Sequence, residues 1–281
     1  MSISPYTAWI GRERTRHDVL DPSAATRLWR TFDSEATARV GDLLPEGWQW
    51  LYFLPDARQS ELGPDGHEKR GGFFPPIAAP RRMFAGGSAR YHGRLVLGVE
   101  AALTERIGDV ALKQGRSGPL WFVRLERRIT QNGELVVEEE QDIVYREPAA
   151  ARGEPRSAGR KAELSAEWRR NVLATSTLLM RFSALTFNTH RIHYDRDYAR
   201  TEEGYPGLVV HGPLIALLLL EEARQRCDGR AFESFTFRSM QPVFEDVPFW
   251  LCGVRNGAAF KLWAELEDGS IAMSAEATLA P

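Results

Sequence analysis

The chain has 281 residues, enough for two domains of ordinary size, and its 36 basic and 38 acidic residues leave no basic excess that would suggest a nucleic-acid partner. With only two cysteines, Cys227 and Cys252, the sequence implies no disulfide framework and fits a reducing compartment. Because the longest apolar run, Leu214 to Leu220, is far shorter than the roughly 20 residues that cross a bilayer, we expect a soluble, cytoplasmic protein without a membrane partner.

The beginning of the chain is predicted to be helical. Within residues 1–40, the sequence Asp21-Pro22-Ser23 can cap and begin a helix that continues to about Asp33. A loop-rich stretch follows, with glycine and proline concentrated in residues 69–82.

An antiparallel sheet is predicted after this loop. Strand character is strongest in residues 121–129 and 135–145, and the pair Asn132-Gly133 between them favours a tight hairpin. A weak central helix is expected around Leu95 to Leu103, because the second half of the chain has a similar order of elements.

A domain boundary is predicted near the middle of the chain. Residues 147–162 combine proline, glycine, alanine and charge without periodicity, which is typical of a linker. We therefore predict an N-terminal domain at 1–150, a linker at 151–162 and a C-terminal domain at 163–281.

The C-terminal domain is predicted to be a buried helix followed by an antiparallel meander. The run from Gly212 to Gln225 is apolar nearly all round at its start, as in a buried helix. Tight turns are expected at Asn256-Gly257 and Asp268-Gly269. The expected strands are 232–237, 248–255, 258–267 and 271–279. This order indicates an α+β fold in which one curved sheet wraps around a helix.

Polar side chains are concentrated in the segment 182–199, which contains Asn188, His190, Arg191, His193, Tyr194, Asp195 and Asp197. Three interpretations stay open. His190, His193 and Asp195 could bind zinc or iron, although His-x-x-His is a short spacing for ligands on one helix face. Asp195 and Asp197 could cap or support a helix that begins near Arg196. One histidine could act as a general acid–base group aimed into a cleft.

A second motif, Val210-His211-Gly212-Pro213, directly precedes the predicted buried helix. The first backbone N–H groups of a helix have no internal partner, and the helix dipole favours negative charge there. Gly212 permits close approach because it has no side chain, and Pro213 suits the first helical turn. This helix start could therefore stabilise the oxyanion that forms when water adds to an unsaturated thioester.

The segment 182–216 resembles the signature of the MaoC-like (R)-enoyl-CoA hydratases and dehydratases. The match runs in order and spacing through Phe182-Ser-Ala-Leu-Thr-Phe-Asn188, His193-Tyr-Asp195, Ala199 and Val210-His211-Gly212. Together with KRGGFFPPIAAPRRMFAGG in the first half, it is most similar to the hydroxyacyl-thioester dehydratase type 2 branch and to mesaconyl-C4-CoA and itaconyl-CoA hydratases. The resemblance implies a double hot-dog fold, in which each half is an antiparallel sheet wrapped around a central helix.

The resemblance also implies roles for individual residues. The family pairs an aspartate with a histidine five residues later; His193 matches the histidine, but Asn188 stands at the aspartate position. An amide cannot accept a proton at neutral pH. Either His193 acts alone with Asn188 positioning the water, which we favour, or His190 shares the proton transfer. Gly212 would supply the oxyanion donor. The residues predicted to bind substrate are His190, Arg191, Tyr194, His211 and Arg82.

The implied reaction is hydration of a C5 dicarboxylic enoyl-CoA, mesaconyl-C4-CoA or itaconyl-CoA, to citramalyl-CoA. Arg191, Arg81 or Arg82 could hold the free carboxylate, or bind the phosphates of coenzyme A, or lie on the surface. The alternatives are a (3R)-hydroxyacyl-thioester dehydratase of fatty-acid metabolism and a non-catalytic acyl-CoA binding module. No metal is expected, and no cofactor other than the coenzyme A carried by the substrate. A homodimer is compatible with the sequence.

Overall fold

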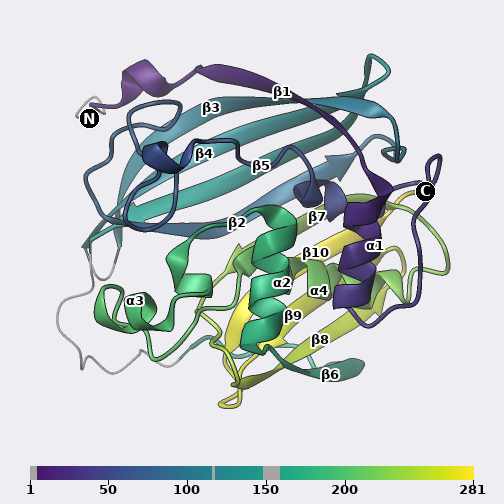
Figure 1. Ribbon diagram of the computed structural model, residues 1–281. Coiled ribbons are helices and arrows are strands. Elements are labelled where there is room, and N and C mark those ends of the chain that lie inside the picture. The colour runs from purple at the N-terminus through teal and green to yellow at the C-terminus, as the bar shows by residue number, and fades with distance from the viewer. Residues whose placement is uncertain (1–4, 116–117, 148–158) are drawn as a thin grey trace.

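Ten strands form one antiparallel sheet in the computed structural model, which describes residues 5–115, 118–147 and 159–281 (Figure 1). Within those ranges the strand order is β1-β3-β4-β5-β2-β7-β10-β9-β8-β6. The strands are β1 Glu13–Val19, β2 Arg81–Tyr91, β3 Glu100–Gly115, β4 Gly118–Gln131, β5 Glu134–Arg146, β6 Trp168–Leu173, β7 Phe232–Ser239, β8 Pro248–Asn256, β9 Ala259–Glu265 and β10 Ile271–Leu279. The first five strands therefore lie on one side of the sheet and the last five on the other.

The two halves of the sheet are joined by β2 and β7, which pair from Gly86 opposite Arg238 to Arg90 opposite Ser234. The chain passes from one half to the other between the end of β5 and the start of β6. Most of the predicted linker, 151–162, lies outside the described residues, so the domain limits stay a prediction.

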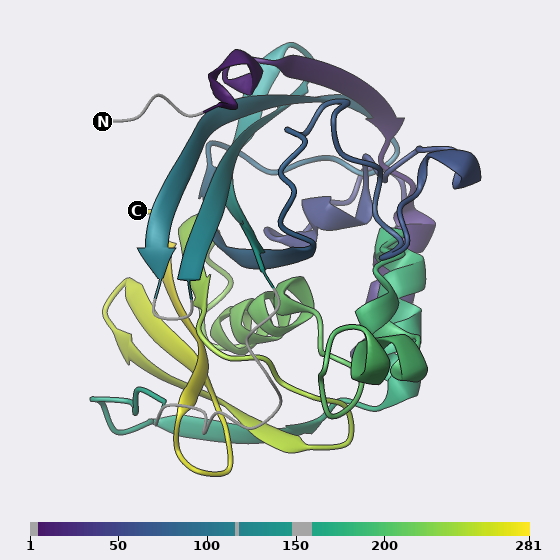
Figure 2. The same ribbon diagram turned by 90° about the vertical axis from the view of Figure 1, so that its left-hand side faces the viewer.

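The helix α4 (Gly212–Arg224) lies inside the curve of the second half of the sheet, as Figure 2 shows. It contacts strands β7 to β10 and also β2. Every residue from Leu214 to Leu220 is buried, which confirms the predicted buried helix. The strands and the turns at Gly257 and Gly269 that follow α4 also agree with the sequence prediction.

The remaining helices are short and lie beside the sheet. The α-helices are α1 Pro22–Thr31, α2 Ser176–Thr186 and α3 Arg196–Thr201, and the 3-10 helices are η1 Thr7–Trp9, η2 Trp48–Leu51, η3 Gln59–Glu61 and η4 Arg191–His193. In Figure 1, α1 from the first half packs beside α2 from the second. No helix within the described ranges is long and apolar enough to cross a membrane.

Local capping and turn chemistry explain where several elements begin. The Asp21 side chain accepts a hydrogen bond from the Ser23 N–H at 2.7 Å and caps α1, as predicted. Asn132 and Gly133 have φ angles of 54° and 83°, the left-handed conformation of a two-residue hairpin turn. The hairpin between β4 and β5 is therefore confirmed.

Two predictions for the first half are wrong. Residues 13–19, expected to be helical, form β1, whose side chains alternate between exposed and half-buried. The helix expected around Leu95 to Leu103 is also absent; this stretch is a loop followed by β3, where burial alternates with a period of two. That period fits a strand against a core and not a helix. Within residues 5–115 and 118–147, the first half therefore has no long central helix.

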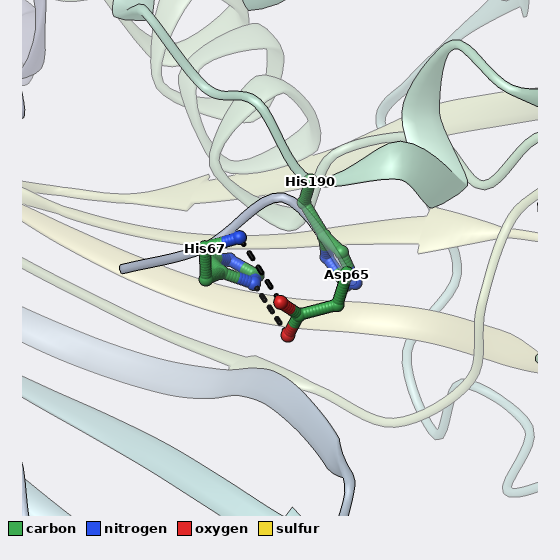
Figure 3. Close-up of side chains that lie close together, drawn as sticks. All are labelled: Asp65, His67 and His190. Carbon is green, nitrogen blue, oxygen red and sulfur yellow. Dashed lines mark hydrogen bonds and ion pairs between the residues drawn. The ribbon is translucent and has the colours of Figure 1, made fainter. Parts of the chain in front are cut away.

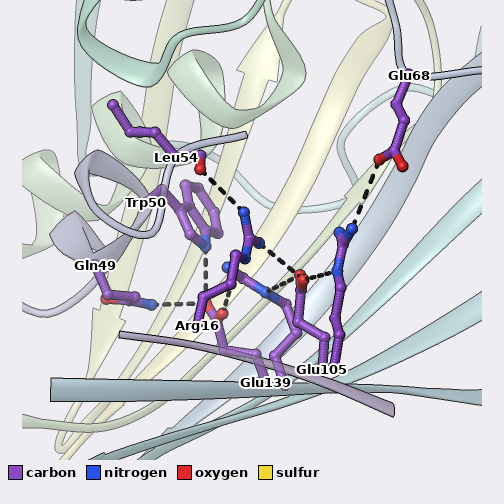
Figure 4. A network of polar contacts seen from close by, with 9 residues as sticks. Arg16, Gln49, Trp50, Leu54, Glu68, Glu105 and Glu139 are labelled. Atoms are coloured by element: carbon purple, nitrogen blue, oxygen red, sulfur yellow. Dashed lines mark hydrogen bonds and ion pairs between the residues drawn. The ribbon is translucent and has the colours of Figure 1, made fainter. Parts of the chain in front are cut away.

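A network of buried charges fills the first half between η2 and strands β3 to β5 (Figure 4). Gln49 and Trp50 of η2 each donate to one oxygen of Glu139 at 2.7 Å. Arg127 pairs with Glu139 and with Glu105, and all three side chains are more than nine-tenths buried. Because each buried charge has a partner, the polar interior is compatible with a stable fold.

The first half is also attached to α4, which fixes its position relative to the second half. The indole N–H of Trp48 donates to Glu221 at 2.9 Å, and Glu46 pairs with Arg224 at 2.6 Å. The segment around η2 therefore packs on the C-terminal end of α4. Segments far apart in the sequence are in this way held together around one core.

Candidate active site

His193 ends the short helix η4, in the polar segment that follows α2. Its Nδ1 lies 2.7 Å from the carbonyl oxygen of Val209. A carbonyl oxygen can only accept a hydrogen bond, so Nδ1 carries the proton and Nε2 has the lone pair when the ring is neutral. Among the described residues, Nε2 has no hydrogen-bond partner. This is the arrangement required of a general base.

The ring of His211 packs against the ring of His193. Their rings stack with centroids 3.7 Å apart and planes 18° apart. His211 is fully buried, its Nε2 is 2.8 Å from the Ser183 hydroxyl, and its Nδ1 has no hydrogen-bond partner among the described residues. A ring without exposed surface can position His193 but is badly placed for the predicted direct contact with substrate.

The loop before η4 presents His190 to the same cluster. Asn188 Oδ1 accepts the backbone N–H of His190 at 3.0 Å, which forms a local turn. The His190 ring then lies edge-on to His193, with centroids 5.4 Å apart. The structure thus brings His190 and His193 together, whereas the oxygen of Asn188 is already engaged in the turn.

A fourth histidine, His67, joins the cluster from the first half of the chain. Its ring centroid is 4.2 Å from that of His190, and its Nδ1 is 3.2 Å from Asp65 Oδ2 (Figure 3). Neither Asp65 nor His67 was predicted from the sequence. The polar sequence Asp65-Gly-His67 within a glycine-rich loop was the one available indication.

Gly212 is the first residue of α4 and follows His211 directly. Its N–H has no acceptor among the residues that the structure describes, as expected at a helix start. A Cβ atom at this position would meet Ser239 Oγ at 3.5 Å and Phe84 Cδ1 at 3.6 Å. The Ser239 hydroxyl is also buried, and it has no hydrogen-bond partner in the described part of the chain. Two unused donors therefore lie close together beside an apolar ring.

The predicted substrate-binding arginines differ in their contacts. Arg191 pairs with Asp195 at 2.7 Å, donates to the Pro64 carbonyl at 3.0 Å and lies over the Tyr198 ring. Arg81 pairs with Glu203 at 3.0 Å. Both guanidinium groups are therefore already engaged within the protein.

Arg82, by contrast, has no carboxylate partner among the described residues. It lies over the Phe74 ring, with 4.6 Å between Cζ and the ring centroid. Burial is the main reason why the pKa values of His67 and His190 are lowered, and the charge of Arg82 lowers both further. It shares one face of β2 with Phe84, two residues on, which adjoins Gly212. Arg82 is thus the predicted arginine best placed to receive an anion.

Other predicted residues have structural partners. The Tyr194 hydroxyl donates to the Thr189 carbonyl at 3.1 Å, and nearly half of the side chain is exposed. Asp195 caps α3 by accepting the Tyr198 N–H at 3.0 Å, which confirms that interpretation. Asp197 lies in the first turn of the same helix.

Three side chains could in geometric terms hold a metal ion. Asp65, His67 and His190 place one ligand atom each within 4.8 Å of one another. This set differs from the one considered in the sequence, because neither His193 nor Asp195 belongs to it. The unpaired guanidinium of Arg82 nearby disfavours a cation, and Asp65 already accepts from His67.

Burial keeps the histidine cluster neutral. It is the main reason why the pKa of His193 is lowered to about 4, while the Val209 carbonyl raises it and the charge of His67 lowers it further. Burial likewise lowers the pKa of His190 and His211 well below the usual histidine value. A neutral imidazole is the form that can take a proton from water.

We expect the stability of the fold to decrease as the pH falls from about 6.5 to 4. In that window the unfolded chain binds protons at these histidines, whereas the native chain does not. His193 alone corresponds to roughly 3 kcal/mol, from a pKa of about 4 in the native state and 6.5 in the unfolded chain. Urea unfolding at a series of pH values measures this, and a His193→Gln variant should show a shallower dependence.

Comparison with known proteins places the chain in a family. The hydroxyacyl-thioester dehydratase type 2 family model matches residues 47–245. The mesaconyl-C(4)-CoA hydratase of Chloroflexus aurantiacus is 48% identical over 99% of both chains. The structure of HtdX from Mycobacterium tuberculosis covers 96% of this chain and 100% of its own, with a TM-score of 0.71 at 16% identity. A second protein of that organism, described as having a double hotdog fold, covers 96% of both chains with a TM-score of 0.59 at 12% identity.

These matches identify the fold and the class of protein. The chain has the predicted double hot-dog fold, and it belongs to the hydroxyacyl-thioester dehydratase type 2 family. The predicted enzyme class, the hydro-lyases, is thereby confirmed.

Proposed function

We propose that this chain adds water to the double bond of a C5 dicarboxylic enoyl-CoA, with mesaconyl-C4-CoA as the first candidate and citramalyl-CoA as the product. The observation that carries the proposal is the 48% identity, over 99% of both chains, to a mesaconyl-C(4)-CoA hydratase. The neutral His193 stacks on the ring of His211, and the next residue, Gly212, has an N–H without an acceptor among the described residues. Together they supply the groups that this reaction needs. Itaconyl-CoA is the second candidate substrate.

The reaction begins with His193 Nε2 taking a proton from water. The resulting hydroxide attacks the β-carbon, and the electrons of the double bond move through the α-carbon to the thioester oxygen. The Gly212 N–H and the Ser239 hydroxyl can donate to that oxyanion, and one such donor is worth about 3 kcal/mol. Protonation at the α-carbon then completes the product. Mesaconyl-C4-CoA suits this sequence because its double bond is conjugated with the thioester.

Arg82 is assigned to the free carboxylate of the substrate. Residues on one face of a strand repeat about every 7 Å, so Arg82 and Phe84 place a cation and an apolar ring along one line. Phe84 adjoins Gly212, where the thioester oxygen is placed. A short dicarboxylic acyl group can therefore extend from Gly212 past Phe84 to Arg82, which can bind a carboxylate in a bidentate manner.

Replacing Arg82 with glutamine is expected to lower kcat/KM for mesaconyl-C4-CoA by about 10- to 100-fold, the effect of losing one hydrogen bond to a charged group. Crotonyl-CoA lacks the carboxylate and should be unaffected. Arg90→Gln, an exposed position on the same strand, is the matched control. Equal losses with both substrates would rule out Arg82 as the residue that recognises the carboxylate.

The alternative function is dehydration of a (3R)-hydroxyacyl thioester in fatty-acid metabolism, which the family description favours. A non-catalytic acyl-CoA binding module would need no base, and the neutral His193 argues against it. Steady-state turnover of mesaconyl-C4-CoA, itaconyl-CoA and crotonyl-CoA distinguishes these cases. Our proposal predicts much higher kcat/KM for a dicarboxylic substrate. A preference for crotonyl-CoA would contradict it in favour of the dehydratase, and binding without turnover would indicate the module.

We propose further that the enzyme needs no cofactor or metal apart from the coenzyme A of its substrate. Its two cysteines are unpaired and buried, in keeping with the proposed cytoplasmic location. A homodimer also remains part of the proposal, to be tested by light scattering.

A further inference from the structure

The loop of the first half that contains Asp65 and His67 is fixed against residues 188–193 of the second half, which we call the catalytic loop. The Thr189 hydroxyl donates to the Gly66 carbonyl at 2.5 Å, and the Arg191 N–H donates to the Asp65 carbonyl at 2.9 Å. Gly66 has a φ of +91°, and a Cβ there would lie 1.9 Å from the backbone carbonyl oxygen of Thr189. This contact leaves no space for a side chain. It therefore sets the position of Asp65 and His67 relative to the histidine cluster.

Asp65 holds His67 in one orientation. One carboxylate oxygen accepts the His67 backbone N–H at 3.1 Å, and the other lies 3.2 Å from the ring Nδ1. The pKa of Asp65 is lowered despite burial, because hydrogen bonds and the charge of His67 favour the carboxylate. An ionised Asp65 can only accept, so His67 carries its proton on Nδ1. Its Nε2 is then directed away from Asp65.

The catalytic loop has no carboxylate at the position that its signature reserves for one. Asn188 occupies that position, and its oxygen is bound to the His190 N–H. Asp195 is engaged with Arg191 and the start of α3. Within the described part of the chain, Asp65 is the carboxylate that adjoins the histidine cluster without pairing to an arginine.

We propose that His67, oriented by Asp65, is a second acid–base residue of the active site, and that this pair from the first half takes the place of the carboxylate that Asn188 lacks. The inference rests on the proposed hydration. His67 is then a catalytic residue, and Asp65 is a positioning residue that acts through it.

The protons balance in this scheme. His193 takes one proton from water, and the hydroxide forms the new C–O bond at the β-carbon. His190 contacts both rings and relays that proton from His193 to Nε2 of the neutral His67. His67 then gives the proton from Nε2 to the α-carbon, which forms the C–H bond and restores the thioester carbonyl. The net change is the addition of one water.

The first test compares Asp65→Asn and His67→Gln with the parent enzyme on the dicarboxylic substrate. We expect kcat to fall at least 10-fold in Asp65→Asn and about 100-fold in His67→Gln, with KM changed less than 3-fold. Asp56→Asn, an exposed carboxylate earlier in the same segment, should retain kcat. A kcat within 3-fold of the parent in both variants, in an enzyme that turns over its substrate, would overturn the inference and leave the proposed function standing.

A rescue variant separates chemistry from loop structure. In the Asp65→Asn background, Asn188→Asp returns a carboxylate to the signature position. We expect it to recover at least 5-fold in kcat, because the second carboxylate takes over the lost role. An absence of recovery would contradict the idea that the two positions share one function.

NMR of the imidazole rings in the free protein measures the tautomer and the titration of His67, and it needs no substrate. It therefore tests the pairing of Asp65 with His67 even if the proposed function is wrong. We expect His67 to hold its proton on Nδ1 and to titrate at lower pH in Asp65→Asn. The groups that influence its titration are Asp65, Arg70, Arg82 and, in the ring cluster, His190 and His193. Identical titration in both proteins would overturn the pairing. So would elemental analysis that found one firmly bound zinc per chain, lost on His67→Gln.

Discussion

Replacing His193 with glutamine is expected to lower kcat by about 100- to 10,000-fold, the usual contribution of a general acid–base group. Glutamine can still donate to the Val209 carbonyl, which His193 contacts at 2.7 Å, so the local geometry should survive. It cannot take a proton from water at neutral pH. The variant therefore removes the chemistry and retains most of the packing, including the contact with the His211 ring. Steady-state rates with mesaconyl-C4-CoA measure the loss.

The control for this variant is His17→Gln, an exposed histidine of β1 that faces Glu100. It should retain the kcat of the parent. Circular dichroism and urea unfolding at pH 7 check that His193→Gln folds. A folded variant with undiminished kcat would exclude His193 as the base.

Replacing Gly66 with alanine is expected to have the largest effect on stability. The new Cβ would lie 1.9 Å from the backbone carbonyl oxygen of Thr189 and 2.8 Å from the carbonyl carbon. Both are backbone atoms, so they cannot move without displacing the chain. The φ of +91° adds strain for any residue with a side chain. Strain and overpacking together cost about 2 to 6 kcal/mol. The loop with Asp65 and His67 must separate from the catalytic loop, so kcat should fall as well.

Gly229→Ala is the matched control for this substitution. Gly229 also has a positive φ, +75°, but a Cβ there meets nothing within 4 Å. It therefore measures backbone strain without the clash. If urea unfolding gave equal losses for the two variants, the close contact between Gly66 and Thr189 would not exist in solution.

Elements with strong local patterns could be predicted from the sequence. The run of leucines in α4 specifies a buried helix wherever it lies, and Asn132-Gly133 specifies a hairpin because both residues tolerate positive φ. The first half was harder to predict. β1 lies at the edge of the sheet and has a polar sequence, so its hydrophobic pattern is weak. The interior of the first half is filled by paired charges such as Arg127 and Glu139. These residues do not contribute to a periodic apolar pattern in the sequence.

The candidate site was predictable where it is continuous in sequence. His190 and His193 lie in one segment, and His211 and Gly212 stand at the start of α4 soon after it in the chain, so a meeting of the two motifs could be expected from chain order. Asp65 and His67 could not be found in this way. The contact that places them beside the other histidines joins Gly66 to Thr189, which are 123 residues apart in the chain. One sequence considered alone contains no signal for such a pairing. The partners of Arg191 were likewise visible only in three dimensions.

The most direct test of the account is a crystal structure with a saturated, unreactive analogue of the C5 dicarboxylic acyl-CoA. We predict its thioester oxygen about 3 Å from the Gly212 nitrogen, within the range of an N–H···O hydrogen bond. Its β-carbon should face His193 Nε2, and its free carboxylate should contact Arg82. An analogue bound with its acyl group away from His193 and Gly212 would contradict the central claim, that these two residues form one hydration site.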